Sequence, residues 1–243
     1  MNTKNNTTNS NYSCQNCLNI NCLIYTNRKN QNVSKFVENK KLLRCKKGQQ
    51  FIMEGAMVNG LFIILEGTAK VFRTGINGKE QIVRFAKDGE VVGHRGFGTE
   101  ESYPIGAVAL EDTLLCYFSK EHLQEALLSS AKLSYDMMLF YANELNRSES
   151  KVKTISQMTV RERVIDTLLY INRKFGTTSG YLNLLLTRKE YADYAGTTEE
   201  QVIRTFSSLK KEGFIGARGK KISILDVEGL KAEISQHNFF LDS

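Results

Sequence analysis

Short apolar runs broken by glycines mark the part of the chain between Lys46 and Phe97, and the same texture continues to residue 118. The runs have the length of strands and are rich in β-branched and aromatic residues; they lie at 61–65, 69–73, 81–85, 107–110 and 113–118. Asn77-Gly78 lies between two of these runs and suits a type I′ hairpin turn, because both central positions of that turn have positive φ. Many short strands with glycine turns predict an antiparallel sandwich, roll or barrel.

After residue 118 the apolar positions follow a helical period. Residues 119–128 begin with Ser119, a good helix cap, and residues 131–158 form one long segment without Pro or Gly. The apolar positions of this long segment are three, four or seven residues apart; they are Leu133, Met137, Tyr141, Leu145, Val152 and Ile155. This stripe predicts a helix that either packs against its own β domain or pairs with its twin in a dimer.

The last third of the chain predicts a separate helical domain. Its helical segments lie at 160–176, 186–196 and 197–215. The second and third begin with a threonine followed three residues later by a glutamate, which is the capping-box pattern, at Thr187/Glu190 and Thr197/Glu200. Because Gly196 leaves only a short connection, these two helices predict a helix-turn-helix. Residues 216–225 then predict a short hairpin with basic residues at its tip, which is a wing.

Composition indicates a cytoplasmic globular protein. With 243 residues, of which 41% are hydrophobic, the chain can bury the cores of one large or two ordinary domains. Residues 1–12 are rich in Asn, Thr and Ser, which predicts disorder. They contain no apolar signal-peptide region, and no run of about 18 apolar residues follows, so we expect no membrane segment.

The net charge of +7 is unevenly placed. Residues 1–50 hold nine Lys and Arg against one Glu, a balance of +8, whereas the remaining 24 basic and 25 acidic residues sum to −1. The basic excess lies at the N-terminus, so net charge by itself does not indicate nucleic-acid binding. The histidines His94, His122 and His237 are scattered and no Ser/His/Asp arrangement or P-loop is present, so we do not expect an enzyme.

Three of the five cysteines are close together in SCQNCLNINC (13–22); they are Cys14, Cys17 and Cys22. This spacing suits zinc, an iron–sulfur cluster and a redox-active thiol pair alike. Structural disulfides are rare in the cytoplasm, so metal binding, redox chemistry and plain burial remain as alternatives. Cys45 is interpreted as a structural cysteine.

The chain resembles the Crp/Fnr family of bacterial transcription regulators over roughly residues 12–225, through the long helix, the winged helix-turn-helix and the stretch KKGQQFIMEGAMVNGLFIILEGTAKVFRTGINGKEQIVRFAKDGEVVG (46–93). The resemblance implies an α+β fold with a cyclic-nucleotide-binding-like antiparallel β-roll, a long dimerisation helix and a C-terminal winged helix-turn-helix. The implied domains are an N-terminal cysteine tail, a β-roll sensor domain, the dimerisation helix and the DNA-binding domain, at 1–30, 31–129, 130–158 and 159–243.

The resemblance also implies that a helix at 198–212 enters the major groove of DNA. Glu200 and Arg204 share a face of it, where Arg204 can bond N7 and O6 of guanine and Glu200 can accept from N4 of cytosine. The Fnr branch usually has serine before this arginine, whereas this chain has Ile203. Phosphate contacts are expected from Arg188, Lys189, Thr198, Lys210, Arg218 and Lys220.

These residues also have a purely structural alternative. Glu200 could do no more than close a capping box with Thr197. A Glu/Arg pair four residues apart, such as Glu200 and Arg204, often stabilises only its own helix. Each basic residue, taken alone, could be a solvated surface charge.

Relatives that bind cyclic AMP hold it with an acid from a G-E-L stretch and an arginine from an R-S-A stretch. In this chain these stretches read Gly93-His94-Arg95 and Pro104-Ile105-Gly106. A buried phosphate without a paired cation is costly, so we do not expect cyclic AMP to bind. His94 and Arg95 remain candidates for binding another small anionic effector.

In the Fnr branch, three N-terminal cysteines and one from a late roll strand hold a [4Fe–4S] cluster. The resemblance implies this role for Cys14, Cys17, Cys22 and Cys116, with a flexible tail that folds over the roll. The gap between the second and third cysteines is one residue shorter than usual. Zinc on the same thiolates, a regulatory thiol pair at Cys14 and Cys17, and no metal at all are the alternatives.

The resemblance therefore implies a homodimeric regulator that senses oxygen, nitric oxide or redox state. It would bind a near-palindromic double-stranded operator, and RNA polymerase if it is an activator. One alternative is a regulator of the same family without a cluster, which responds to a small anion in the β-roll. A more distant alternative is an iron–sulfur or zinc redox or metal protein that does not act on DNA.

Overall fold

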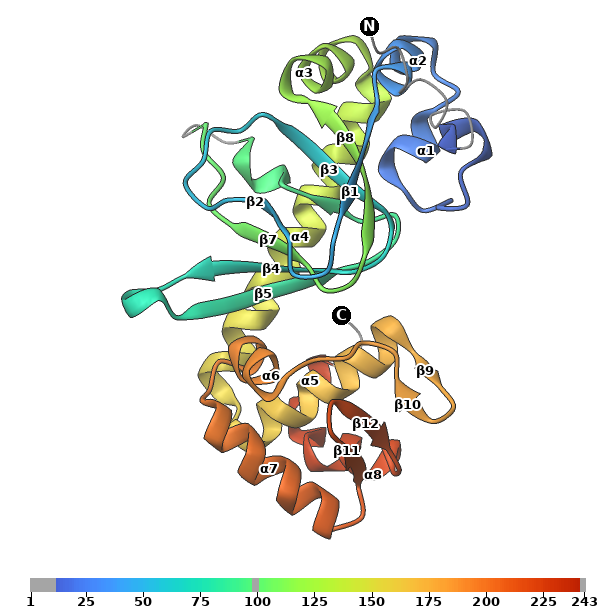
Figure 1. The fold of residues 1–243 in the computed structure, drawn as a ribbon. Coiled ribbons are helices and arrows are strands. Elements are labelled where there is room, and N and C mark those ends of the chain that lie inside the picture. The colour runs from blue at the N-terminus through green and yellow to red at the C-terminus, as the bar shows by residue number, and fades with distance from the viewer. Residues whose placement is uncertain (1–11, 98–100, 241–243) are drawn as a thin grey trace, which may run out of the picture. The chain divides into compact units, whose positions relative to one another are not determined.

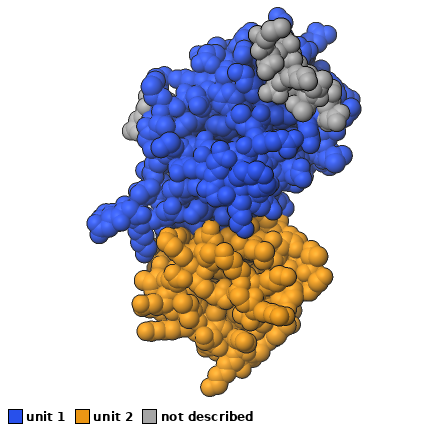
Figure 2. All heavy atoms as spheres, viewed as in Figure 1, with its two compact units in different colours: residues 1–142 blue, residues 143–243 orange. Residues whose placement is uncertain are grey.

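The computed structural model describes residues 12–97 and 101–240, and the chain divides into two compact units, residues 1–142 and 143–243 (Figures 1 and 2). The disorder predicted for the first residues falls on a segment outside the described range. Each unit is described by itself below. Within the described residues, every helix is too short or too polar to cross a membrane.

Unit 1 contains two antiparallel four-stranded sheets (Figure 1). The first has the strand order β1-β8-β3-β6, with bounds Lys41–Cys45, Thr113–Ser119, Gly60–Glu66 and Val91–Val92. The second has the order β2-β7-β4-β5, with bounds Gln50–Ile52, Gly106–Ala109, Ala69–Thr74 and Glu80–Ala86. The predicted antiparallel β-roll is confirmed.

The two sheets enclose an apolar core, to which both contribute fully buried side chains such as Ile64, Leu115 and Ala107. The hairpin expected at Asn77-Gly78 connects β4 and β5, and both residues have positive φ, 60° and 72°. Five residues rather than two separate the strands, because Gly75 and Lys79 extend the turn through a bond from the Gly75 N–H to the Lys79 carbonyl.

A second apolar cluster lies between the first sheet and the helices of unit 1. These helices are α1, α2, α3 and the first part of α4, with bounds Leu23–Asn27, Gln31–Glu38, Lys120–Ser129 and Ala131–Gln157. Phe36 of α2 stacks on Phe118 of β8 with ring centroids 4.4 Å apart. The sequence does not predict α1 and α2, because both are short. Both nevertheless bury apolar side chains in this cluster, Ile24 from α1 and Val33 from α2.

The apolar stripe of α4 divides between two environments. Leu133 and Met137 are buried in the second cluster of unit 1. Farther along the helix Leu145, Val152 and Ile155 are exposed, Leu145 by 59%. The first part of the stripe thus packs on its own domain, as one alternative proposed, and the second part is left for the other alternative, a dimer seam. The dimer stays a prediction.

Unit 2 is built on helices α5, α6, α7 and α8, with bounds Val160–Phe175, Arg188–Ala195, Glu199–Lys211 and Val227–Glu233, followed by the 3-10 segment η5 at Ser235–Phe240. Two small hairpins accompany them, β9/β10 at Thr177–Thr178 and Tyr181–Leu182, and β11/β12 at Ile215–Arg218 and Lys221–Ile224. The helix-turn-helix is α6 and α7, and the predicted wing is β11/β12, whose tip lies between Arg218 and Lys221.

Helix caps explain where the helices of unit 2 begin. The capping box at Thr187/Glu190 forms as predicted, and a second one forms at Thr159/Glu162. The box expected at Thr197/Glu200 is wrong. Gly196 takes the left-handed conformation (φ 67°, ψ 46°) and Thr197 is buried in the turn, so α7 begins one residue later, with Thr198 as N-cap accepting from the Gln201 N–H.

Candidate cysteine site and DNA-binding elements

Four cysteines from distant parts of the chain line one hollow in unit 1. They are Cys14, Cys17, Cys22 and Cys116, the set that the resemblance to the Fnr branch implied. All five cysteines of the chain are free thiols, and Cys45 lies apart, in the core between the sheets. The structure therefore brings the implied ligand set together and leaves the fifth cysteine out, in agreement with its interpretation as structural.

Short local structures place the three N-terminal thiols. Cys14 opens a 3-10 turn capped by the Ser13 hydroxyl, and Cys22 is the residue before α1. Between them, the Asn19 side-chain amide donates to the Leu65 carbonyl of β3 at 2.8 Å, which fastens the loop to the first sheet. Cys116 lies in the middle of β8, between Leu42 of β1 and Ile63 of β3, so the rigid sheet fixes the fourth thiol.

The hollow has one cation and no carboxylate among its lining residues. The Lys40 ammonium lies 3.6 Å from Cys14 Sγ and also donates to the Tyr12 carbonyl. Burial raises the pKa of Cys14, and Lys40 opposes that shift. Burial, helped by the neighbouring Cys14 and Cys22 thiols and opposed by Lys40, raises the pKa of Cys116 to about 12. Four thiolates can therefore coexist here only around added positive charge. Sequence reasoning missed Lys40.

Four cysteine thiols are the donor set of a [4Fe–4S] cluster and also of a structural zinc site. No three His, Cys, Asp or Glu side chains in the described part of the chain are arranged to hold a single metal ion. Zinc would need its thiolates around one ion, whereas each thiolate of a [4Fe–4S] cluster binds a different iron. The hollow itself is about 10 Å³, room for about one water, so the loop of Cys14–Cys22 has to move outward around a cluster.

The outward face of α7 carries the residues expected to read bases. Val202, Phe206 and Leu209 are buried against the rest of unit 2. Glu200 and Arg204 point the other way and are exposed, and no ion pair joins them within the described residues. The structural alternatives for Glu200, a capping box with Thr197 and a pair with Arg204, are therefore not what the structure contains.

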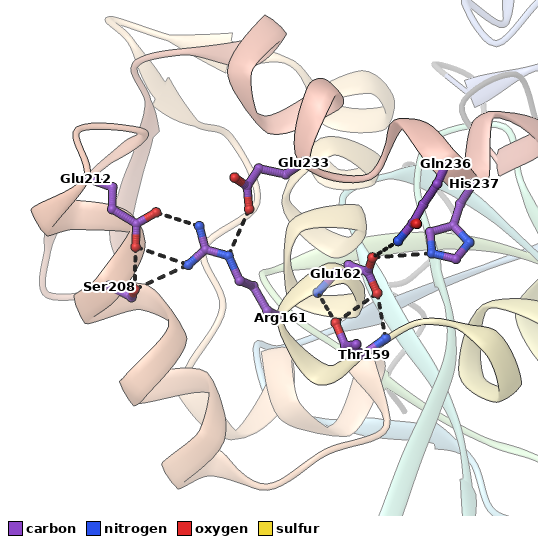
Figure 3. A network of polar contacts seen from close by, with 8 residues as sticks. All are labelled: Thr159, Arg161, Glu162, Ser208, Glu212, Glu233, Gln236 and His237. Carbon is purple, nitrogen blue, oxygen red and sulfur yellow. Dashed lines mark hydrogen bonds and ion pairs between the residues drawn. The ribbon is translucent and has the colours of Figure 1, made fainter.

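A polar network holds the C-terminal end of α7 against α5 and α8 (Figure 3). The Arg161 guanidinium of α5 donates to Glu212 at 2.5 Å and 3.2 Å and to Glu233 at 2.9 Å. These carboxylates raise the pKa of Arg161 above its usual value. The network fixes the direction of α7, and hence of its outward face.

The residues expected to contact phosphates fall into two groups. Lys210, Arg218 and Lys220 are exposed, and Thr198 is exposed as the cap of α7. Arg188 instead lies over the Phe206 ring at 4.5 Å and donates to the Gly219 carbonyl, and Lys189 pairs with Asp193 at 2.7 Å. These last two side chains already have structural partners, which the sequence did not indicate.

A second hollow lies in the roll beside His94 and Arg95. Its lining includes Arg84, a buried residue whose guanidinium donates to the Val91 carbonyl. The sequence indicates His94 and Arg95 for this place and does not include Arg84. Side chains two residues apart in a strand point to the same face. Since Ile82 of β5 is apolar and buried, this rule could have placed Arg84 on the inward face. The expectation that cyclic AMP does not bind stays a prediction.

Comparisons with known proteins match both units. The cyclic nucleotide-binding domain family matches residues 42–130, and the Crp-like helix-turn-helix domain family matches residues 162–233. The chain is 30% identical to the transcriptional activator protein FnrA of Stutzerimonas stutzeri over 190 residues, 77% of this chain and 78% of that protein. It is 27% identical to the anaerobic regulatory protein of Pasteurella multocida over 223 residues, 89% of this chain and 81% of that protein.

Among solved structures, FixK2 from Bradyrhizobium japonicum superposes with a TM-score of 0.72, at 23% identity and over 79% of this chain and 96% of that one. This likeness supports the fold. The identity to FnrA extends over most of both chains and includes both units. Together with the two family models, this relative shows that the chain belongs to the Crp/Fnr family and is a DNA-binding transcription regulator.

Proposed function

We propose that this regulator senses oxygen, nitric oxide or redox state through a [4Fe–4S] cluster on Cys14, Cys17, Cys22 and Cys116. The observation that carries the proposal is the gathering of four thiols from opposite ends of unit 1 around one hollow. Two similar proteins are named FnrA and anaerobic regulatory protein, and these names support a regulator that responds to oxygen.

The residues of the site have separate tasks in this proposal. Cys116 is the fixed ligand, because the sheet holds it, and the three N-terminal cysteines are the movable ones. Lys40 supplies a positive charge against the thiolates. When bound, such a cluster supplies a redox-active inorganic centre whose breakdown frees its ligands. Loss of the cluster would loosen the N-terminal segment from the sheet and from α4.

For DNA, we propose a homodimer that places one α7 helix in each half-site of a near-palindromic operator. Arg204 reads guanine and Glu200 reads the paired cytosine, since both are exposed and project from the outward face of α7. Lys210, Arg218 and Lys220 bind phosphates, which positions the helix without specifying bases. RNA polymerase is a further partner if the protein activates transcription.

The first test is an anaerobic purification of the full chain, with an absorbance spectrum and analysis of iron, sulfide and zinc. We expect a brown protein with about four irons per chain that bleaches in air. Cys116→Ser should lose the iron. Cys45→Ser is the matched control, because Cys45 is also a buried strand cysteine but lies in the other core, and it should keep the iron.

Other results of this purification would decide against the cluster. A colourless protein with one zinc per chain would show that the cysteines hold a structural zinc ion and not a cluster. A colourless protein without metal would remove the cluster and favour the second candidate function. That candidate is a regulator that binds a small anion beside Arg84, His94 and Arg95, which three basic side chains around one hollow favour.

The DNA-reading part is tested separately, by measuring the affinity of the full chain for a selected operator. Arg204→Ala should lose roughly 1–3 kcal/mol of specific binding and relax the preference for guanine at one position of each half-site. Unchanged specificity in this variant would show that α7 does not read DNA through Arg204.

A further inference from the structure

One large apolar side chain stands on the outward side of α7. Ile203 is 47% exposed, although its neighbour Val202 is fully buried in the core of unit 2. At about 100° per residue, Ile203 lies outside the buried stripe and one turn away from Glu200 and Ser207. Ile203 is the one large apolar residue of α7 with about half of its surface open to solvent.

The helix itself gains little from this residue. Isoleucine is a weaker helix former than alanine, lysine or glutamine, because its branched side chain loses freedom against the preceding turn. That same stiffness is useful for recognition. An isoleucine in a helix keeps essentially one χ1 rotamer, so its methyl groups hold a fixed position and lose little entropy when they make a contact.

We propose that Ile203 reads the C5-methyl group of a thymine in the major groove. This inference rests on the proposed function, in which α7 enters that groove. Thymine is the base that presents an apolar group there, and apolar side chains recognise it by contact rather than by a hydrogen bond. Ile203 lies in the first turns of α7, the part of a recognition helix that reaches base edges, directly before Arg204.

The anchoring of α7 makes the contact specific. Thr198 caps the N-terminal end, and the Arg161 network holds the C-terminal end (Figure 3). Ile203 therefore keeps a constant offset from Arg204 and Glu200. The half-site should accordingly contain a thymine at a fixed step from the guanine–cytosine pair, and cytosine, which lacks the methyl group, should be rejected there.

The test removes a single methyl group from the DNA. The full chain first selects operators from a random duplex library, and each thymine of the half-site is then replaced in turn by deoxyuridine. At one position, deoxyuridine should weaken binding roughly three- to fivefold, the value of one buried methyl group. Ile203→Ala should bind the thymine and deoxyuridine operators equally, whereas Ile203→Val should still distinguish them.

The outcomes separate this inference from the proposed function. If Arg204→Ala relaxes a guanine position but every deoxyuridine substitution affects wild type and Ile203→Ala alike, α7 reads DNA and Ile203 does not read thymine. If the wild type selects no motif, or Arg204→Ala selects the same motif, the role of α7 itself is wrong. Because Ile203 is exposed, its variants should melt at the wild-type temperature, which a thermal scan checks.

Discussion

Two lysines with unusual neighbours stand out at the residue scale. Lys40 is the one cation that lines the cysteine hollow, and Lys151 lies with its ammonium 3.7 Å from the centre of the Tyr194 ring. Neither follows from the sequence pattern, because nothing local distinguishes Lys40 from Lys41 or Lys151 from Lys153. Lys41, next to Lys40, and Lys210, in the same unit as Lys151, serve as controls in the predictions below.

Lys40→Gln should weaken the retention of iron in the anaerobically prepared protein. The ammonium 3.6 Å from Cys14 Sγ offsets the negative charge of the thiolates, and loss of such a supporting group typically costs about 10–100-fold in metal affinity. The measurement is the release of iron to a chelator in the absence of oxygen. Lys41→Gln, an exposed neighbour, should behave like wild type; equal release from both variants would remove Lys40 from the site.

Lys151 should make the stability of unit 2 depend on pH. Burial lowers the pKa of this lysine to about 8, against a nearby Asp166 that raises it. Between pH 8 and the unfolded pKa near 10.4, the unfolded chain holds more protons, so this group makes the free energy of unfolding rise with pH. Below pH 8 the lysine is charged in both states and its desolvation lowers stability.

Lys151→Met should therefore remove that rise, with a limiting slope of about 1.4 kcal/mol per pH unit. Chemical denaturation from pH 7 to pH 10.5 gives the free energy of unfolding of wild type and variant. The titration of the cysteines is common to both proteins and cancels in the difference between the two free energies. Lys210→Met, an exposed lysine of the same unit, is the control. A wild-type curve parallel to that of Lys151→Met would mean that Lys151 has an ordinary pKa.

At the scale of elements, the short helix α1 links the cysteine segment to the long helix α4. Cys22 directly precedes α1, and Asn27 at its end donates to Asp136 of α4 at 2.8 Å. Next to it, the Asn30 amide donates to the Ser130 hydroxyl at 2.9 Å. Leu133 and Met137 share an apolar cluster with Cys116, so polar and apolar contacts both connect the site to the first part of α4.

Asn27→Ala should weaken this connection and leave the sheets intact. A hydrogen bond to a charged group contributes roughly 1.5–3 kcal/mol, so we expect a loss of stability of that order for unit 1. Amide hydrogen exchange should accelerate around residues 131–137. Asn39→Ala removes only a local bond to the Lys35 carbonyl, and it should leave that exchange unchanged. Equal exchange in both variants would contradict the link.

At the scale of the whole molecule, α4 is the element that the two units share, because it begins in unit 1 and ends in unit 2. Its buried apolar side chains Leu133 and Met137 lie in the cluster that contains Cys116, and its exposed apolar side chains form the surface on which we predict a second copy to pack. The exposed large hydrophobic side chains of α4 are Tyr135, Met138, Leu139, Leu145, Val152 and Ile155. Met138, Leu145 and Val152 are seven residues apart, the repeat of a two-stranded coiled coil.

Leu145→Glu should therefore prevent dimerisation, because a carboxylate would be buried in the apolar seam. Sedimentation should show a monomer, and affinity for a two-half-site operator should fall by about 100-fold or more, since both half-sites can no longer be bound at once. Leu128→Glu changes an exposed leucine of α3 and should leave the oligomeric state unchanged. A dimer that survives Leu145→Glu would place the interface elsewhere.

The sequence predicts those parts of the fold that repeat or that depend on local turn chemistry. The strands around Asn77-Gly78, the box at Thr187/Glu190 and the wing all have such signals, and each appears in the structure. The start of α7 was wrong by one residue, because the buried position of Thr197 is decided by packing across the turn.

The surroundings of the cysteine site could not be predicted in the same way. Cys116 and the N-terminal cysteines could be grouped only through the resemblance, since 94 positions separate Cys22 from Cys116 (116 − 22). Lys40 and Arg84 enter their hollows because of strand register and chain path, which no short pattern records. Burial of a charged side chain depends on which elements meet, and that is a property of the folded chain.

The long separation between Cys22 and Cys116 has a mechanical consequence. A cluster bound at both ends would act as an inorganic staple that closes a very large ring of chain. By the chain-entropy model, a disulfide that closes a ring of about 100 residues stabilises a fold by roughly 4.7 kcal/mol, because the unfolded chain loses freedom. Removing such a staple would release the N-terminal segment and also enlarge the set of unfolded states. Loss of the cluster would then lower the free energy of unfolding of the whole of unit 1.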